Sequence, residues 1–192
     1  MFEDYLFTLA SASPRRRELL KGLDIAFTVE PGKDEREAYS EGMPHTEIPE
    51  FLARHKSETF HRELAPREVL ITADTLVFLD EKILGKPRDR EDAAAMLRAL
   101  SGRTHTVTTG LALRTRGRIH TFSDTTEVDF KPLTDEEIDY YIENYRPFDK
   151  AGAYGIQEWI GFVGITAIRG SYFNVMGLPV QRLYTELCDF LY

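Results

Sequence analysis

Apolar runs and amphipathic stretches alternate along the chain. The apolar runs are rich in aliphatic and β-branched residues, which favour strands, and the longest extends from Val69 to Leu79. Strands are expected over 5–10, 25–29, 69–79, 82–85 and 162–168, with two or three more between 104 and 130. The stretches between these runs have the apolar spacing of helices that pack one face onto a sheet. This order of elements predicts an α/β fold with a mixed sheet.

Capping residues place the starts of most helices. Ser13 followed by Pro14 predicts a helix that stops at Gly22. Thr134 and Glu137 fit a capping box. Further helices are expected from Pro49 to Leu64, with Phe51, Leu52, Phe60 and Leu64 as a loose apolar stripe, from Asp89 to Leu100, from Asp135 to Asn144, and from Pro179 through Leu183, Leu187 and Leu191.

Composition and charge narrow the class of protein. The 192 residues, 42% of them hydrophobic, contain no repeat or flexible linker, and suit one domain over 1–192 or two small lobes sharing a core. The net charge of −8 disfavours a nucleic-acid partner, because the two polyanions repel each other. The acidic start and the lack of a long uncharged apolar run argue against a signal peptide and a membrane span. The single cysteine, Cys188, suits a reducing compartment, so we expect a cytoplasmic protein.

Three consecutive arginines, Arg15, Arg16 and Arg17, occupy the first turn of the first expected helix. A helix N-terminus already carries partial positive charge, so cations there are unfavourable unless an anion lies beside them. Free backbone N–H groups, the Ser11 hydroxyl and guanidinium groups together suit a phosphate. The alternative is a solvated basic turn, and Arg17 is the arginine that we assign to solvent.

A lone acid, Asp74, interrupts the most apolar strand of the chain. An ionised carboxylate in such a strand costs several kcal/mol unless it is paired, hydrogen-bonded or metal-bound. Lys86 follows the expected hairpin turn and is a candidate partner. Asp74 and a second carboxylate, Glu35, are candidates for holding a metal ion or orienting a water molecule. The alternative is a structural Asp–Lys pair.

A glycine-rich segment over 149–157 ends in Gln157. Glycines permit close approach of the backbone, and a carboxamide can complement the O4 and N3–H of uracil or thymine. A surface loop is the alternative. The chain contains neither a P-loop nor a dinucleotide-binding fingerprint, and its histidines do not have zinc-site spacing.

Several motifs together closely resemble those of the Maf family, over about 6–187. They are LASASPRRRELL over 9–20, ADT over 73–75, GKP over 85–87, LSG over 100–102, DKAGAYGIQ over 149–157 and GSYFNVMGLPV over 170–180. The resemblance implies a two-lobed α/β fold with a central cleft, related to that of inosine triphosphate pyrophosphatases. It also implies a nucleoside triphosphate pyrophosphatase that often forms homodimers.

The resemblance also assigns roles to individual residues. Asp74 matches the catalytic proton acceptor, and Arg16, Thr75 and Gln157 match positions associated with base selection. Ser11, Arg16, Glu35, Lys56, Lys86 and Gln157 match polar residues that line the family's cleft. The pattern looks like the branch acting on dTTP and UTP rather than on 7-methyl-GTP. One departure is Glu158, where the family usually has glycine, and it bears on substrate preference, modified pyrimidine nucleotides included.

These residues suggest a mechanism. Ser11, Arg15 or Arg16, Lys56 and Lys86 are expected to hold the phosphates. A Mg²⁺ or Mn²⁺ ion bound by Asp74 or Glu35 would neutralise charge on the leaving pyrophosphate, while Asp74 accepts a proton from the attacking water. The alternative from another class is a non-catalytic, nucleotide-sensing regulator of septum formation, because the family was first linked to inhibition of septation.

Overall fold

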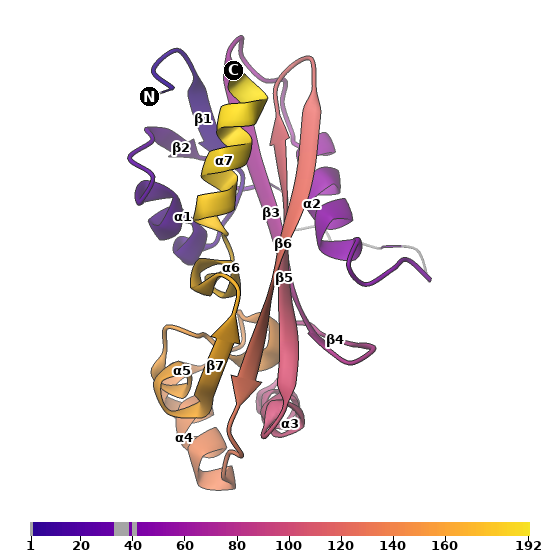
Figure 1. Ribbon diagram of the computed structural model, residues 1–192, viewed down its shortest axis with the longest axis vertical. Helices are drawn as coiled ribbons and strands as arrows, with labels where there is room; N and C mark the ends of the chain where they lie inside the picture. The colour runs from indigo at the N-terminus through magenta and orange to yellow at the C-terminus, as the bar shows by residue number, and fades with distance from the viewer. Residues whose placement is uncertain (1, 33–38, 40–41) are drawn as a thin grey trace. The chain divides into compact units, whose positions relative to one another are not determined.

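A computed structural model describes residues 2–32, 39 and 42–192 (Figure 1). Within these residues, seven strands form one sheet with the order β2-β1-β3-β5-β6-β7, and β4 pairs with β3. The strands are β1 (Leu6–Leu9), β2 (Phe27–Val29), β3 (Glu68–Leu79), β4 (Lys82–Leu84), β5 (Thr104–Arg114), β6 (Ile119–Phe130) and β7 (Ile165–Arg169). The helices are α1 (Pro14–Lys21), α2 (Ile48–Glu58), α3 (Arg90–Leu100), α4 (Asp135–Tyr145), α5 (Trp159–Gly164), α6 (Tyr172–Met176) and α7 (Val180–Leu191), with a short 3₁₀ turn, η1 (Ala151–Ala153).

The sheet is mixed, as the sequence predicts. β1 pairs in parallel with β2 and with β3, and helices α1 and α2 make the connections between these strands. β4 is antiparallel to β3, and β7 is antiparallel to β6. Parallel strands are usually covered on both faces, and β3 is accordingly buried over Glu68–Ala73. The expected α/β class is confirmed.

The chain divides into two compact units. The first unit comprises 1–74, 109–124 and 177–192, and the second comprises 75–108 and 125–176. The boundary therefore falls inside β3, directly after Asp74. Each unit has its own buried residues.

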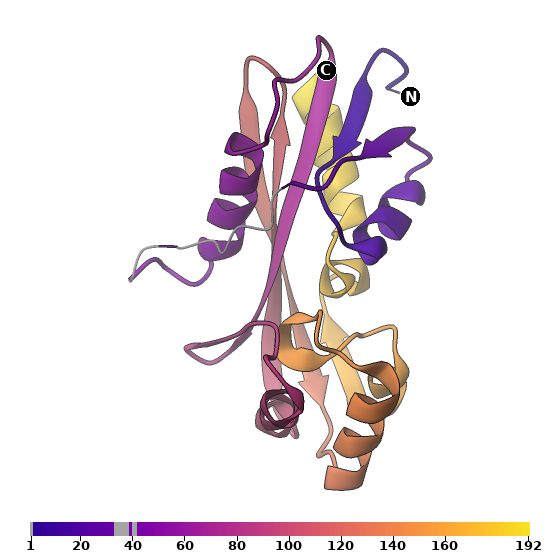
Figure 2. The same cartoon turned by 180° about the vertical axis from the view of Figure 1, so that it is seen from behind.

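In the first unit, α2 and α7 lie on opposite sides of the strands (Figures 1 and 2). Leu183 and Leu187 of α7 are buried, as the sequence predicts, and α2 buries Leu52 and Ala53. Gly110 of β5 permits the approach of α2, because a Cβ there would lie 2.1 Å from the Pro49 carbonyl carbon. The unit therefore has a sheet covered by helices on two sides.

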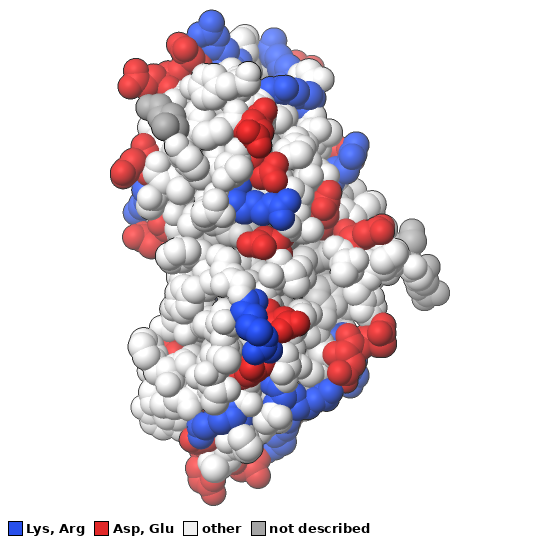
Figure 3. Space-filling view, in the orientation of Figure 1, with Lys and Arg blue, Asp and Glu red and all other residues white. Residues whose placement is uncertain are grey.

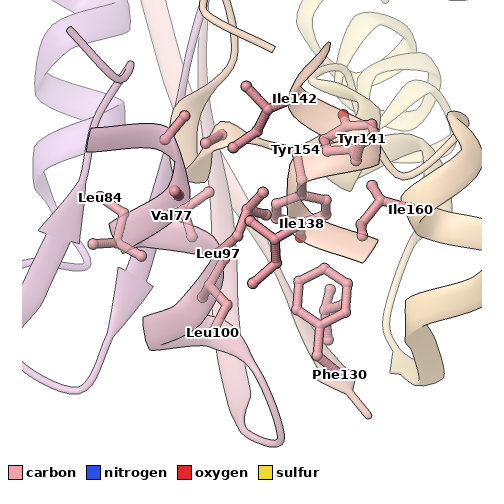
Figure 4. Close-up of a cluster of buried hydrophobic side chains, with 14 of the residues drawn as sticks. Val77, Leu84, Leu97, Leu100, Phe130, Ile138, Tyr141, Ile142, Tyr154 and Ile160 are labelled. Carbon is pink, nitrogen blue, oxygen red and sulfur yellow. The ribbon is translucent and has the colours of Figure 1, made fainter. Parts of the chain in front are cut away.

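The core of the second unit joins α3, α4, α5 and the 3₁₀ turn to the ends of the long strands (Figure 4). Leu97 and Leu100 of α3 and Ile138 of α4 are almost completely buried there. Asp89 caps α3 through the Asp92 N–H, and Thr134 and Glu137 form the predicted capping box of α4. These local signals place both helices where the sequence predicts them.

Two expectations about secondary structure are wrong. The strand expected over 162–168 begins only at Ile165, because 159–164 form α5, in which Ile160 is buried and Phe162 is 82% exposed. The helix expected to Leu64 ends at Glu58. Phe60 and Leu64 leave the helical path and pack with Leu70 in a separate cluster. Burial by neighbouring elements overrides β-propensity in the first case and helical spacing in the second.

Charged side chains of both signs are interspersed on the face of the molecule shown in Figure 3. None of the helices in the described ranges is long and apolar enough to cross a membrane.

Candidate functional site

The first candidate group lies around the start of α1, at the end of β1. Ser13 caps the helix by accepting a hydrogen bond from the Arg16 N–H, at 3.4 Å, and Pro14 is the first helical residue. The buried Ser11 accepts a hydrogen bond from the Ser13 N–H at 3.2 Å. Arg17 is exposed, as predicted, whereas Arg15 and Arg16 are half-buried. The strand-to-helix turn therefore holds Ser11 and Arg16 close together.

Arg16 connects three segments of the first unit. Its Nε donates to the Gly177 carbonyl oxygen at 2.8 Å, and its Nη1 donates to the Ala73 carbonyl oxygen at 2.8 Å. Nη1 also lies 3.5 Å from Ser11 Oγ. A planar guanidinium can make such divergent bonds from one rigid group, which an ammonium cannot. Arg16 thus has a structural role that the sequence does not reveal.

Asp74 lies in a short, partly exposed part of β3. Residues 68–73 and 77–79 are buried, but Asp74, Thr75 and Leu76 are only half-buried. The Asp74 side chain is 16% exposed. The carboxylate therefore does not point into sealed packing, and it directly follows Ala73, the residue bound by Arg16. Arg16 is therefore bonded to the backbone directly before Asp74.

The cation that pairs with Asp74 is Lys56. Lys56 lies in the last turn of α2, and its Nζ donates a hydrogen bond to Asp74 Oδ1. The Lys56 side chain is 31% exposed, so the pair is accessible from one side. Lys86 was the sequence-based candidate for this pairing. It is an exposed residue of the second unit, and its proximity to Asp74 stays a prediction.

In the second unit, the loop carrying Lys86 is joined to the glycine-rich segment. The Gly152 N–H donates to the Gly85 carbonyl oxygen at 3.1 Å. Gly152 has φ of +68°, and a Cβ there would lie 3.1 Å from Val77, so both its backbone conformation and its packing favour glycine. Two segments that the sequence singles out separately are thus neighbours.

Gln157, at the end of this segment, is half-buried. Its Oε1 is buried, and among the described residues no donor satisfies it. An unsatisfied buried acceptor is costly, which makes it a candidate for receiving a donor from a ligand.

Three side chains bonded to one another near the end of this segment are functional candidates, and the sequence assigns no role to two of them, Lys150 and Tyr141. Lys150 Nζ lies 3.1 Å from Glu158 Oε1, and the Tyr141 hydroxyl donates to Glu158 Oε2. Burial and the Glu158 carboxylate raise the pKa of Tyr141, which keeps the hydroxyl protonated as a donor. The only signal in the sequence was Glu158 itself, which stands where the family usually has glycine.

The residues present fit a metal ion only in part. Among residues 2–32, 39 and 42–192, no three His, Cys, Asp or Glu side chains form a ligand group. Mg²⁺ is usually held by one or two carboxylates together with substrate phosphates, so the accessible Asp74 alone is compatible with it. Glu35, the second expected ligand, lies outside the described residues.

Sequence comparisons give one consistent result. The family model described as Maf-like protein matches residues 6–190. A relative from Phocaeicola vulgatus is 55% identical over 96% of both chains, and one from Porphyromonas gingivalis is 53% identical over 97% of this chain and 94% of the relative. A third, from Bacteroides thetaiotaomicron, is 49% identical over 96% of both chains. All three relatives are named dTTP/UTP pyrophosphatase.

Solved structures are more distant. A HAM1 protein from Coxiella burnetii matches with a TM-score of 0.48 and 17% identity, over 96% of this chain and 99% of that chain. A nucleoside-triphosphatase, dITP/XTP pyrophosphatase, from Mycobacterium abscessus matches with a TM-score of 0.38 and 16% identity, over 73% of this chain and 95% of that chain. Scores this low support no inference. The family match and the relatives, which extend over nearly the whole sequence, establish that this chain belongs to the Maf family.

Proposed function

We propose that this protein hydrolyses UTP and dTTP to the nucleoside monophosphate and pyrophosphate, by attack of water on the α-phosphorus. The main structural support is Asp74, a carboxylate held by Lys56 in the accessible part of an otherwise buried strand. Three relatives with about half of their residues identical carry the name dTTP/UTP pyrophosphatase, which supports the choice of substrates.

Asp74 is the proposed proton acceptor. Lys56 donates to Oδ1, and this pair leaves the second carboxylate oxygen, Oδ2, for a water molecule. Oδ2 is therefore suited to accept a proton from water as the oxygen attacks phosphorus. Lys56 keeps the carboxylate in one orientation, which is what a general base requires.

The proposed phosphate-binding residues are Ser11, Arg15, Arg16, Lys56 and Lys86. Ser11 and Arg16 are in contact at the N-terminus of α1, where the helix dipole favours an anion. Lys56 places a further positive charge beside Asp74. Cations around a triphosphate stabilise the negative charge that develops on the leaving pyrophosphate.

A divalent cation, Mg²⁺ or Mn²⁺, is part of the proposal. Asp74 and Glu35 are the proposed ligands, and a direct bond to Glu35 would leave Asp74 Oδ2 available as the proton acceptor. When bound, the cation would neutralise negative charge on the phosphates. The residues proposed to select the base are Arg16, Thr75 and Gln157. The Gln157 carboxamide can complement the O4 and N3–H of uracil and thymine.

Labelled water provides the direct test. The protein is incubated with UTP, dTTP, CTP and GTP and a divalent cation in H₂¹⁸O, and pyrophosphate release is measured. We expect release from UTP and dTTP, loss of release with EDTA, and the label in the monophosphate rather than in pyrophosphate. Label in pyrophosphate would place attack at the β-phosphorus and overturn the proposed reaction.

A non-catalytic regulator would behave differently in the same experiment. It would bind nucleotide without releasing pyrophosphate from any of the four substrates. We further propose that the chain acts as a single functional domain, forms a homodimer and is cytoplasmic. Light scattering of the purified protein decides the oligomeric state.

A further inference from the structure

Glu158 lies at the centre of a cluster of polar side chains in the second unit. Its Oε1 pairs with Lys150 Nζ at 3.1 Å, and its Oε2 accepts a hydrogen bond from the Tyr141 hydroxyl. Lys150 Nζ also donates to Asp149 Oδ1 at 2.7 Å. The Lys150 and Glu158 side chains are only 9% and 19% exposed. Removing one partner of such a buried ion pair leaves the other charge uncompensated, so the members of this cluster depend on one another.

The cluster fixes both ends of the glycine-rich segment. Lys150 stands near its start and Glu158 directly follows its end, so their ion pair closes the loop. Tyr141 of α4 connects Glu158 to the interior of the segment, because its hydroxyl also accepts a hydrogen bond from the Gly155 N–H at 3.0 Å. The segment is thereby attached to the core of the second unit, in which Tyr141 is completely buried (Figure 4).

The backbone of the segment is packed directly around these groups. A Cβ at Gly155 would lie 2.9 Å from Glu158 Cδ and 3.1 Å from Lys150 Cε. A Cβ at Gly161 would lie 1.8 Å from the Ile156 carbonyl oxygen, so the turn after Gln157 is also tightly packed. Gln157 therefore lies between a buried Ile156 and an anchored Glu158, with little freedom for its backbone.

This constraint matters because the backbone sets where the Gln157 side chain begins, and so which edge of a base its carboxamide can reach. Uracil and thymine present an N3–H donor, whereas cytosine presents an N3 acceptor and an amino group. A carboxamide oxygen that faces the base accepts a hydrogen bond from the N3–H of uracil or thymine, whereas it leaves the N3 acceptor of cytosine unsatisfied. Gln157 Oε1 is a buried acceptor that lacks a donor among the described residues, which matches a uracil or thymine N3–H.

We propose that Glu158, with Tyr141 and Lys150, is a positioning set that holds the Gln157 backbone in the place from which its carboxamide selects uracil and thymine over cytosine. This inference rests on the proposed function. It assigns a purpose to Glu158, the residue at which this chain departs from the glycine expected of the family.

Two variants test the proposal, each with a different change. Tyr141→Phe removes the bridging hydroxyl but keeps the aromatic ring. Glu158→Gln removes the charge but keeps the shape, and Lys150 retains Asp149 as a partner. Tyr140→Phe is the matched control, because it removes the hydroxyl of the adjacent, exposed tyrosine in the same helix.

Steady-state kinetics with UTP and CTP distinguish a loss of base selection from an equal loss of activity on both substrates. In Tyr141→Phe we expect the UTP-to-CTP ratio of kcat/KM to fall by roughly tenfold, mainly through KM for UTP. Glu158→Gln should show a smaller change in the same direction, since glutamine still accepts from Tyr141, and Tyr140→Phe should leave the ratio unchanged. An equal loss for UTP and CTP would overturn the proposal, because it indicates a purely structural role.

A double-mutant cycle with Gln157→Ala tests whether the set acts through Gln157. Tyr141→Phe should have no further effect on the UTP-to-CTP ratio in the Gln157→Ala background. An effect that persists there would also overturn the proposal. Thermal unfolding of each variant confirms that folded proteins are compared.

Binding of non-hydrolysable analogues distinguishes failure of the inference from failure of the proposed function. Calorimetry with α,β-imido UTP and CTP measures base discrimination without turnover. If the wild-type protein releases no pyrophosphate but prefers the UTP analogue, and the variants lose that preference, only the proposed reaction fails. If the wild-type protein binds both analogues equally, the positioning proposal fails.

Discussion

Arg16 Nη1 donates a hydrogen bond of 2.8 Å to the carbonyl oxygen of Ala73, the residue directly before Asp74. The bond joins the first motif of the chain to the strand that carries the proposed base, although the two residues are 57 positions apart. It explains why a basic residue occupies the first turn of α1, where the helix dipole alone disfavours it.

Replacing Asp74 by asparagine should abolish most of the activity. Asparagine keeps the shape and can still accept the Lys56 hydrogen bond, but it is not a base. We expect kcat for UTP to fall by at least ~100-fold, the usual contribution of general-base catalysis. Asp80→Asn, at the exposed end of the same strand region, is the matched control and should retain normal turnover. Comparable rates for the wild type and Asp74→Asn would remove Asp74 from the mechanism.

Arg16→Lys should lower both stability and activity. A lysine cannot reach Ser11, Ala73 and Gly177 at once, so at least one charge-assisted hydrogen bond is lost, at a cost of about 1.5–3 kcal/mol. Urea denaturation monitored by circular dichroism measures the change in the free energy of unfolding. Arg17→Lys, at an exposed position in the same turn, should leave the unfolding midpoint where it is. A normal midpoint for Arg16→Lys would show that these bonds contribute little.

The buried His105 should make stability depend on pH. Burial lowers its pKa from 6.5 to about 4, while its Nε2 lies 2.7 Å from the Tyr154 hydroxyl. The folded state therefore favours the neutral imidazole, and the unfolded state binds more protons between pH 4 and 6.5. The free energy of unfolding should therefore be highest above pH 6.5. It should fall by about 3 kcal/mol at most as the pH is lowered to 4.

Unfolding free energies measured across this pH range check the His105 prediction. The pH dependence should be clearly weaker in His105→Gln, which cannot titrate. Acidic groups also titrate in this range, so the comparison is the difference between the two proteins. If both curves have the same slope, His105 is not the group responsible.

Gly161→Ala should destabilise the protein through a backbone clash. The added Cβ would lie 1.8 Å from the Ile156 carbonyl oxygen, so the turn that contains Gln157 must move. Overpacking of this kind costs about 1–3 kcal/mol. Gly117→Ala, where the added Cβ meets no atom within 4 Å, is the control for the intrinsic effect of the substitution. Thermal unfolding should separate the two variants by several degrees.

Local signals in the sequence determined much of the secondary structure. The caps at Ser13, Asp89 and Thr134 were predicted correctly, because a capping side chain bonds a backbone group only three residues away. The long strand β3 and the hairpin to β4 were also predicted, since apolar runs and turns are encoded over a few adjacent residues. The motif order was sufficient to indicate the family.

Tertiary structure alone decided the partners of the site residues. Lys56 reaches Asp74 from the end of a helix, and Tyr141 reaches Glu158 from another, so neither contact leaves a local pattern in the sequence. Tertiary structure also decided that 159–164 form the helix α5, because burial of Ile160 outweighs the strand preference of Phe162 and its neighbours. The sequence determines capping and periodicity through short-range bonds, whereas ion pairs and packing depend on which distant elements the fold brings together.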